Sequence, residues 1–273
     1  MNRFLKRAWA EIDLDALTHN YNEIKKLAKG KEILAVVKAN AYGHDDKAVC
    51  LKLQELGVKY YGVSNLWEGE KLRQHGITGT VLTFGYTDED YFDELLEYGI
   101  TQTAGSVQYA KELSDYAVSK GVKLPVHIKV NTGMTRVGID TEEEMLEILA
   151  MPGLDCKAAY THFAAADSFE PSDIEYTNRQ QEKLMKIASD KGLLIHSQNS
   201  GGIVYHGEFG GDIVRAGVIL YGHCPNYPLE VPFEMKSVMT VKSVVSQLKT
   251  IPAGTQISYG RTYTDRLCRR IFP

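Results

Sequence analysis

The stretch SKGVKLPVHIKV, residues 119–130, contains the unit from which we predict the fold. A segment with helical spacing runs up to Gly121, an apolar residue follows the glycine, and a short strand-like run then begins. Glycine just past a helix readily takes the left-handed conformation that ends it, and the apolar residue after it can close the cap. The stretch therefore predicts a helix, a glycine turn and a strand, in that order.

The same junction recurs along the chain, as ELGVKYYGV, QHGITGTVLTF, EYGITQTAG, MPGLDCKAAYTHF and DKGLLIHSQNS. The strand-like runs are mostly continuous in apolar residues: ILAVV, YYGVS, TVLTF, TQT, PVHIKV, CKAAYTH, LLIHSQ and IVRAGVILYG. Such strands between helices indicate a parallel sheet covered on both faces. Eight runs equal the strand number of a (β/α)₈ barrel, which is the fold class we predict. A doubly wound open sheet is the alternative.

Helix beginnings carry their own signals. Asp13 precedes a segment with apolar residues at helical spacing, and it is suited to capping that helix. Thr141 and Glu144 have the spacing of a capping box. We therefore expect helices to begin at both places.

The residue composition of the chain changes after residue 222. The segment HCPNYPLEVPFEM contains three prolines and no helical pattern, and the following residues are rich in Val, Ile, Ser and Thr. This composition is typical of a connector followed by antiparallel strands. We expect a barrel over residues 1–222, a linker over 223–235 and the beginning of an all-β C-terminal domain over 236–273. The first strand, AWAEIDL, is a candidate member of that β domain.

Composition excludes several classes of protein. The chain has 273 residues and a net charge of −4, so it lacks the basic surface of a nucleic-acid binder. No run is long enough to span a membrane, and the N-terminus lacks the apolar stretch of a signal peptide. The cysteines are scattered, as expected for core residues in a reducing cytoplasm: Cys50, Cys156, Cys224 and Cys268. Neither they nor the histidines show metal-ligand spacing, so we expect no catalytic metal.

Functional groups of a parallel barrel lie where its strands end. The polar residues that close or follow the predicted strands are Lys38, Asn131, Arg136, His162, Asn199, Ser200 and Arg215. A barrel would bring them to one rim although they lie far apart in the sequence.

Lys38 closes the apolar run of ILAVVKANAYGHDD, residues 33–46. An apolar setting lowers the pKa of a lysine and makes its amine nucleophilic, and such lysines form Schiff bases with carbonyls and with pyridoxal phosphate. The alternative is a lysine that extends its amine to solvent. Spacing alone leaves both open.

The other rim residues also carry alternatives. In QNSGGIV and RAGVILYG, small residues let backbone N–H groups approach a phosphate, although glycine-rich turns are common. His162 is a candidate general base, ring-stacking residue or hydrogen-bonded core histidine. Arg136 and Arg215 stay charged, so each needs either an anionic ligand or a structural carboxylate when buried.

Together these stretches resemble the bacterial alanine racemases. AVVKANAYGH is similar to that family's pyridoxal-phosphate attachment signature, and KVNTGMTRVG, THFA, QNS, RAGVILYG and PAGTQISYGRTY follow in the family's order over residues 8–264. The resemblance implies a barrel with a C-terminal β domain, pyridoxal 5′-phosphate as cofactor and a small amino acid as substrate. It also implies a cytoplasmic homodimer with shared active sites.

The resemblance also assigns roles to residues. Lys38 would hold the cofactor and act as one acid/base, and Tyr259 would be the second base, reaching into the partner subunit's site. The residues implied at the cofactor's phosphate are Tyr42, Asn199, Ser200, Gly217 and Val218.

The remaining roles concern the cofactor's ring and the substrate. His162 would support the ring, Arg215 would face the pyridine nitrogen, and Arg136 would contact the phenolic oxygen and the substrate carboxylate. Lys129 corresponds to a lysine that is carbamylated in some members of the family.

The chain also departs from the family pattern. Asp45 and Asp46 stand where glycines are usual, and Asn131 stands where aspartate is common. The tail DRLCRRIFP does not resemble the family's continuation, so we expect a C-terminally truncated chain. An alanine racemase is the leading prediction. The alternatives are a serine racemase of the same family and a barrel that binds cofactor but turns over weakly or not at all.

Overall fold

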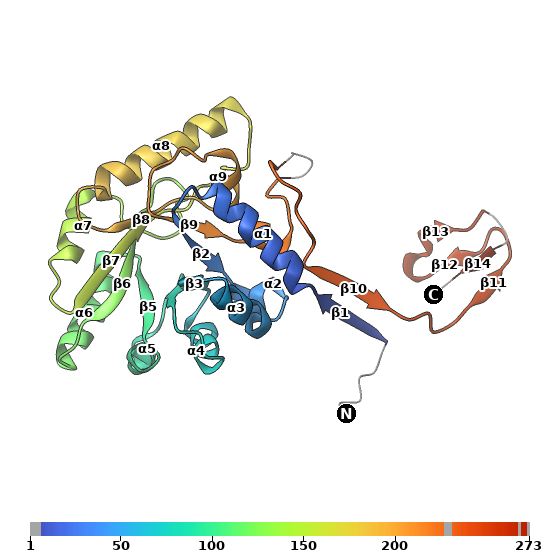
Figure 1. Cartoon of the computed structure of the whole chain (residues 1–273), viewed down its shortest axis with the longest axis horizontal. Helices are drawn as coiled ribbons and strands as arrows, with labels where there is room; N and C mark the ends of the chain where they lie inside the picture. The colour runs from blue at the N-terminus through green and yellow to red at the C-terminus, as the bar shows by residue number, and fades with distance from the viewer. Residues whose placement is uncertain (1–6, 227–230, 267–268, 272–273) are drawn as a thin grey trace. The chain divides into compact units, whose positions relative to one another are not determined.

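The computed structural model describes residues 7–226, 231–266 and 269–271 (Figure 1). It contains two compact units. One comprises residues 13–238, and the other combines the residues up to Ile12 with those from Met239 onward.

The first unit is built on an eight-stranded parallel sheet with the order β8-β7-β6-β5-β4-β3-β2-β9. Its strands are β2 (Glu32–Val36), β3 (Tyr60–Val63), β4 (Thr80–Thr83), β5 (Ile100–Ala104), β6 (Leu124–Lys129), β7 (Leu154–Tyr160), β8 (Leu194–His196) and β9 (Ile213–Ala216). The two end strands also meet, because the Asp212 N–H donates to the Ile195 carbonyl and the Arg215 N–H to the Gln198 carbonyl, both at 2.8 Å. The sheet is therefore nearly closed. The predicted barrel is confirmed, and the open sheet is wrong.

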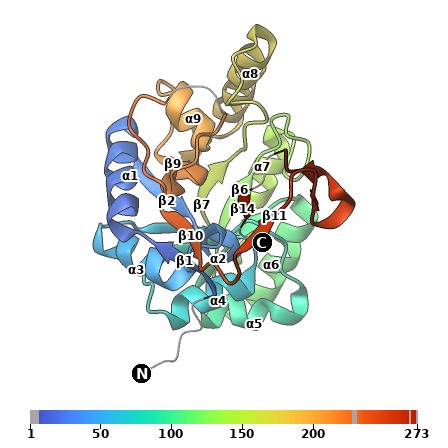
Figure 2. The ribbon, with the colours of Figure 1, turned by 90° about the vertical axis from the view of Figure 1, so that its right-hand side faces the viewer.

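Helices surround the strands (Figure 2). They are α1 (Leu14–Leu27), α3 (Asp46–Glu55), α4 (Leu66–Gln74), α5 (Phe92–Glu97), α6 (Val107–Ser119), α7 (Glu142–Leu149), α8 (Pro171–Ala188) and α9 (Ser200–Tyr205). The predicted caps are present: Asp13 accepts two backbone N–H groups at the start of α1, and Thr141 and Glu144 form a capping box on α7. Gly121 follows α6 with φ +69°, as its junction predicts.

The strands pack through their apolar side chains. Leu34, Val36, Leu82 and Ile213 form a buried cluster, against which Phe84 packs. Fully burying one such side chain stabilises the fold by about 2 kcal/mol. These contacts fix where each strand ends, and hence where the residues that follow it lie.

Residues 236–238 close onto the barrel. Asn20, buried on α1, donates from Nδ2 to the carbonyls of Leu220 and Lys236 at 3.0 and 2.8 Å. Gly222 has φ +84°, and a Cβ there would lie 2.1 Å from the Lys236 carbonyl oxygen. Glycine is therefore required where the chain leaves the 3₁₀ helix η2 (Val218–Tyr221).

The second unit consists of antiparallel strand pairs. The first strand, β1 (Ala8–Ile12), pairs with β10 (Met239–Ser243), as its sequence allowed. The other pairs are β11 (Lys249–Ile251) with β14 (Arg269–Ile271), and β12 (Gln256–Ile257) with β13 (Tyr263–Thr264).

The described residues bear on two further expectations. Cys50 is buried, whereas Cys156 and Cys224 are half-buried, so the prediction of core cysteines holds only in part; Cys268 lies outside the described residues. Within the described ranges, none of the helices combines the length and apolar character that a membrane crossing needs.

Candidate active site

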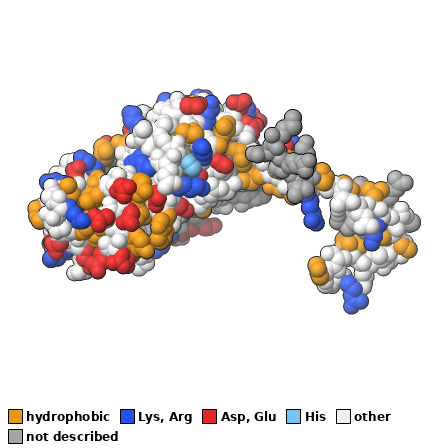
Figure 3. Space-filling view, turned by 90° about the horizontal axis from the view of Figure 1, so that it is seen from below, with side chains coloured by type: hydrophobic (Ala, Val, Ile, Leu, Met, Phe, Trp, Pro, Cys, Tyr) orange, Lys and Arg blue, Asp and Glu red, His pale blue; other side chains and the backbone are white. Residues whose placement is uncertain are grey.

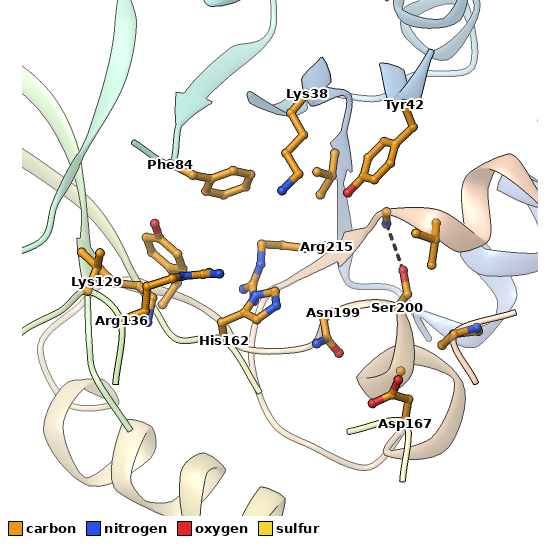
Figure 4. A pocket seen from close by; sticks show the side chains of 17 residues that line it. Lys38, Tyr42, Phe84, Lys129, Arg136, His162, Asp167, Asn199, Ser200 and Arg215 are labelled. Carbon is orange, nitrogen blue, oxygen red and sulfur yellow. Dashed lines mark hydrogen bonds between the residues drawn. The ribbon is translucent and has the colours of Figure 1, made fainter. Parts of the chain in front are cut away.

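A cavity of about 310 Å³ lies where the barrel strands end, and all its lining residues belong to the barrel unit (Figure 4). Ten of the residues singled out in the sequence line it: Lys38, Tyr42, Lys129, Arg136, His162, Asn199, Ser200, Arg215, Gly217 and Val218. The barrel thus brings together groups that are up to 180 positions apart in the chain, from Lys38 to Val218.

Lys38 begins α2 (Lys38–Tyr42), a turn with unusual backbone geometry. The four residues after Lys38, up to Tyr42, all have φ between 52° and 55°, so the turn is left-handed. Each non-glycine residue in this conformation costs about 1–2 kcal/mol. The turn places the half-buried Lys38 at one end and Tyr42 at the other, and both side chains extend into the cavity (Figure 4).

The turn is held by local hydrogen bonds. The Ala41 N–H donates to the Val37 carbonyl at 2.9 Å, and the Gly43 N–H donates to the Ala39 carbonyl at 3.0 Å. The buried His44 ring has its Nδ1 3.0 Å from the Ala41 carbonyl oxygen and 3.1 Å from that of Tyr42. His44 thereby provides a hydrogen-bonding partner for the carbonyls at the end of the left-handed turn.

One pole of the cavity is built from small and hydroxyl residues. The Gly217 N–H donates to Ser200 Oγ at 3.2 Å. A Cβ at Gly217 would lie 3.4 Å from Tyr42 Oη and 3.5 Å from Ser200 Oγ, so the three groups converge. Asn199 caps α9, because its Oδ1 accepts the Gly202 N–H at 3.0 Å. This pole offers hydroxyl and backbone donors to an oxyanion.

Arg215 lies beneath the cavity and is 3% exposed. Its guanidinium donates to the backbone carbonyls of His196 at 2.8 Å, Thr161 at 2.6 Å and Ser197 at 2.9 Å. Burial lowers the pKa of Arg215 to about 10, so it stays charged at neutral pH. No ion pair holds it within the described residues, so a structural carboxylate, one of the two partners considered for it, is wrong there.

His162 stands beside Arg215, with its Nδ1 3.4 Å from Nη2 of the guanidinium. Burial, together with the surrounding cations, lowers the pKa of His162 to about 3. The ring is therefore neutral at pH 7 and a weak base. Among its three sequence interpretations, this favours a ring-contacting role over general base catalysis.

Lys129 lies at the end of β6 and is 5% exposed. Its Nζ donates to the Val130 carbonyl at 2.9 Å and lies 5.5 Å from the centre of the Tyr160 ring. Burial first, and then the charges of Arg215 and Arg136, lower the pKa of Lys129 to about 7. A substantial fraction of this amine is thus neutral at physiological pH.

Arg136 is exposed on the loop that follows β6. Asn131 shapes this loop: its Oδ1 accepts N–H groups of Gly133 at 3.2 Å and Thr135 at 2.9 Å, and its Nδ2 donates to Asp140 at 3.0 Å. Asparagine is therefore favourable at position 131, because its amide donates to the Asp140 carboxylate. An aspartate there would place two carboxylates against each other.

Tyr259 lies in the second unit, at the start of the 3₁₀ helix η3 (Tyr259–Arg261), and its side chain is 98% exposed. Of the proposed site residues, it alone does not line the cavity.

Sequence reasoning missed several lining residues: Val36, Phe84, Val137, Tyr160, Asp167 and Pro225. Tyr160 is the most informative of these. Its ring stacks on His196 at 4.7 Å between centroids, and the Arg215 guanidinium carbon lies 5.5 Å from its centre. A signal was present, because Tyr160 stands two positions before His162 and so points to the same side of an extended chain.

The lining is strongly cationic. Lys38, Lys129, Arg136 and Arg215 contribute positive groups, against a single acidic residue, Asp167. Figure 3 shows Lys and Arg side chains gathered beside a histidine on one face of the barrel unit. Among the described residues, no group of three or more His, Cys, Asp and Glu side chains is placed to hold a metal ion. The cavity is suited to a ligand with several negative charges.

Known proteins share both the sequence and this architecture. The family model for the N-terminal domain of alanine racemase matches residues 12–225. An alanine racemase of Clostridium perfringens is 39% identical over 96% of this chain and 70% of its own length. That of Desulforamulus reducens is 38% identical over 94% of this chain and 72% of its own length.

The chain belongs to the alanine racemase family.

Solved structures agree with this assignment. Alanine racemase of Clostridium difficile 630 superposes with a TM-score of 0.87 at 33% identity, covering 98% of this chain and 72% of that one. A histidine racemase from Leuconostoc mesenteroides also superposes with a TM-score of 0.87, at 27% identity, over 98% of this chain and 74% of its own. The resemblance seen in the motifs is confirmed, and the chain joins a family of isomerases.

Proposed function

We propose that this protein is a pyridoxal-phosphate-dependent racemase that interconverts L- and D-alanine by a two-base mechanism. One observation carries the proposal: the Lys38 amine, the pole formed by Tyr42, Ser200 and Gly217, and the buried Arg215 all face a single cationic cavity. The family of the chain and the names of its relatives support the substrate.

The residues present fit the cofactor. Its phosphate suits the hydroxyl groups of Ser200 and Tyr42, which converge on Gly217, and the missing side chain of Gly217 leaves space between them. Val218 begins the 3₁₀ helix next to them, and Asn199 completes the wall. Lys38 would hold the aldehyde carbon covalently. When bound, pyridoxal phosphate withdraws electrons from the substrate Cα and so acidifies its proton.

Two groups would move that proton. Lys38 would remove or deliver it on one face of the substrate, and Tyr259 of a second copy of the chain would act on the opposite face. Racemisation needs a base on each face, because a single base returns the proton to the side from which it came. Arg136, exposed at the cavity wall, would bind the substrate carboxylate.

Arg215 and Lys129 would set the electrostatics. Arg215 keeps its proton at neutral pH, so toward the ring nitrogen it would donate a hydrogen bond rather than a proton. The partly neutral Lys129 amine can add carbon dioxide. The carbamate would place a negative charge near Arg136 and Arg215.

A homodimer with shared sites and a cytoplasmic location are parts of the same proposal. The 98% exposed Tyr259 is available to a second copy, and Cys50 and Cys156 form no disulfide, as is usual in a reducing compartment.

The test is an assay of both directions of alanine racemisation on the purified chain with added pyridoxal phosphate. We expect conversion of alanine in preference to serine, and a fall of about 10³-fold in the Lys38→Ala variant. Borohydride reduction with the cofactor should label Lys38. A chain that converts no alanine and leaves Lys38 unlabelled would refute the proposal, whereas labelling without conversion would indicate the cofactor-binding, inactive alternative.

A further inference from the structure

The Glu68 carboxylate joins two neighbouring strand ends. Glu68 lies in the first turn of α4. Its Oε1 accepts the Ala39 N–H at 2.8 Å, and its Oε2 accepts the Ser64 N–H at 2.7 Å. Both oxygens are thus used, and hydrogen bonds to an ionised acceptor are stronger than those between neutral groups.

The two N–H donors lie next to Lys38 and at the end of β3. Ala39 is the residue directly after Lys38 and the first of the left-handed turn, and Ser64 directly follows β3. The carboxylate therefore ties the backbone next to Lys38 to the end of the adjacent strand. Ala39 is itself exposed, so packing of its side chain contributes little to its left-handed conformation, although its carbonyl also accepts the Gly43 N–H.

Different groups hold the far end of the turn. The Asp46 N–H donates to Asn40 Oδ1 at 3.0 Å, His44 contacts the last carbonyls, and the Tyr42 ring lies 5.2 Å from that of Tyr221. The Tyr42 end thus has several anchors that do not involve Glu68.

Support of α4 does not account for the bridge. Asn65 already caps this helix, because its Oδ1 accepts the Glu68 N–H at 3.1 Å. The Glu68 side chain is therefore free of that task and is directed to two N–H groups outside the helix.

We propose that Glu68 is a positioning residue for Lys38, which keeps the amine directed into the cavity by holding Ala39 in the left-handed turn. The role deepens the proposed function, since it concerns the condensation of Lys38 with the cofactor aldehyde. By this proposal Glu68 holds the Lys38 end of the turn, whereas the Tyr42 end, next to the proposed phosphate site, is held without Glu68.

The test uses the Glu68→Gln variant of the full chain, which keeps the volume of the side chain but replaces one acceptor oxygen with a donor. The matched control is Glu70→Gln on the same helix, where the carboxylate accepts from Gln74 and interacts with Tyr98, both away from the turn after Lys38. Hydrogen exchange of the Ala39 and Ser64 amides, without cofactor, should quicken by about tenfold in Glu68→Gln and stay unchanged in the control.

Two binding measurements then separate positioning from general damage. The rate at which pyridoxal phosphate and borohydride label Lys38 should fall by about tenfold. Affinity for pyridoxine 5′-phosphate, which has no aldehyde and cannot condense, should stay within about twofold because the phosphate end is intact. A merely structural role would weaken both together.

Several outcomes would overturn the inference. Unchanged amide exchange, unchanged labelling, or equal losses of labelling and analogue affinity would each do so. If Glu68→Gln does not fold, Glu68→Asp replaces it, since the shorter carboxylate cannot bridge both N–H groups and must show the same split. Failure to label Lys38 in the unmodified chain would instead refute the proposed function, and the exchange result would stand apart from it.

Discussion

The position of Lys38 depends on a left-handed turn whose backbone conformation is energetically unfavourable. Four successive left-handed residues after Lys38 together cost about 4–8 kcal/mol. Such strain persists only where surrounding contacts determine the conformation, and it concentrates at functional sites. The contacts of Glu68, Asn40 and His44 with the turn provide that determination.

Substitutions at Asp45 compare the cost of its positive φ with the stability gained from its cap on α3. It has φ +68°, and its carboxylate accepts the Ala48 N–H at 2.9 Å at the start of α3. Glycine takes this conformation without strain and is nearly as good a cap, so Asp45→Gly should stabilise the fold by about 0.5–1 kcal/mol in urea unfolding. Asp45→Ala keeps the strain and loses the cap, and should destabilise by about 1 kcal/mol. Destabilisation by the glycine would show that the departure from the family's glycine is favourable here.

Tyr259 is predicted to act on one face of the substrate only. Because the equilibrium constant of racemisation is one, Tyr259→Phe must lower kcat/KM by the same factor in both directions. The equilibrium constant does not require the Cα protons of the two enantiomers to exchange with deuterated solvent at equal rates. Exchange should survive for the enantiomer whose proton faces Lys38 and be lost for the other, as measured by NMR on each enantiomer. Equal loss for both would argue against a face-specific base.

The sequence indicated most site residues but not the geometry of the Lys38 turn. Lys38, His162 and Ser200 could be found because each stands at the end of an apolar run, where a barrel places its chemistry. The left-handed turn could not, since its conformation depends on Glu68, a residue 30 positions away from Lys38. Tyr160 was missed because a buried tyrosine in an apolar strand looks like core.

Among the elements, strand register decides which side chains face each other. Leu34 in β2 pairs with Arg215 in β9, and Lys129 in β6 pairs with Tyr160 in β7. These pairings set Arg215 beside the strand that leads to Lys38, and Tyr160 beside Lys129. The short segments after β8 and β9 then meet at Ser200 and Gly217.

Gly217 tests this junction of elements. An alanine Cβ at position 217 would meet no atom closer than 3.4 Å, an ordinary packing distance, so Gly217→Ala should fold, and urea unfolding of the variant checks its stability. The added methyl would lie 3.4 Å from Tyr42 Oη, inside the space proposed for phosphate. We expect the affinity for pyridoxine 5′-phosphate to fall by at least about tenfold in calorimetric titration. An unchanged affinity would place the phosphate elsewhere.

At the scale of the whole molecule, the barrel buries a pair of neutral histidines. His127 and His196 are 1% and 0% exposed, and their ring nitrogens lie 3.1 Å apart inside the barrel. Burial lowers the pKa of His127 to about 4 and that of His196 well below its ordinary value. Both rings are therefore neutral in the folded chain and take up protons on unfolding in mild acid.

This burial predicts a dependence of stability on pH. Stability is complete above the unfolded pKa of about 6.5 and is lost as the pH falls toward the lower folded pKa values. At pH 5 each buried ring should cost about 2 kcal/mol, measured by urea unfolding of the cofactor-free chain against pH 7. His162, whose pKa is lowered to about 3, should add a similar loss, so His127→Gln should remove about a third of the total. The same loss in the variant would mean that other groups cause it.

Shared active sites predict complementation between inactive chains. Lys38→Ala and Tyr259→Phe each inactivate both sites of their own homodimer. A mixed dimer has one site with both native groups, so co-expression should restore about a quarter of the native activity. The purified single variants serve as controls. Failure to restore activity in a dimer shown to be mixed would place Tyr259 in the site of its own chain.

The pattern of residues in the chain was sufficient to predict the barrel, the helix caps at Asp13 and Thr141, and most of the residues that line the cavity, some of them only through the family resemblance. The barrel, the caps and the strand-end residues follow from short-range chemistry: glycine after a helix, apolar runs for buried strands, and polar residues where those runs stop. The handedness of the turn after Lys38, the use of backbone carbonyls by Arg215 and the low pKa of Lys129 came only from the folded structure. They depend on which distant groups are packed together and kept from water, and no local pattern specifies that.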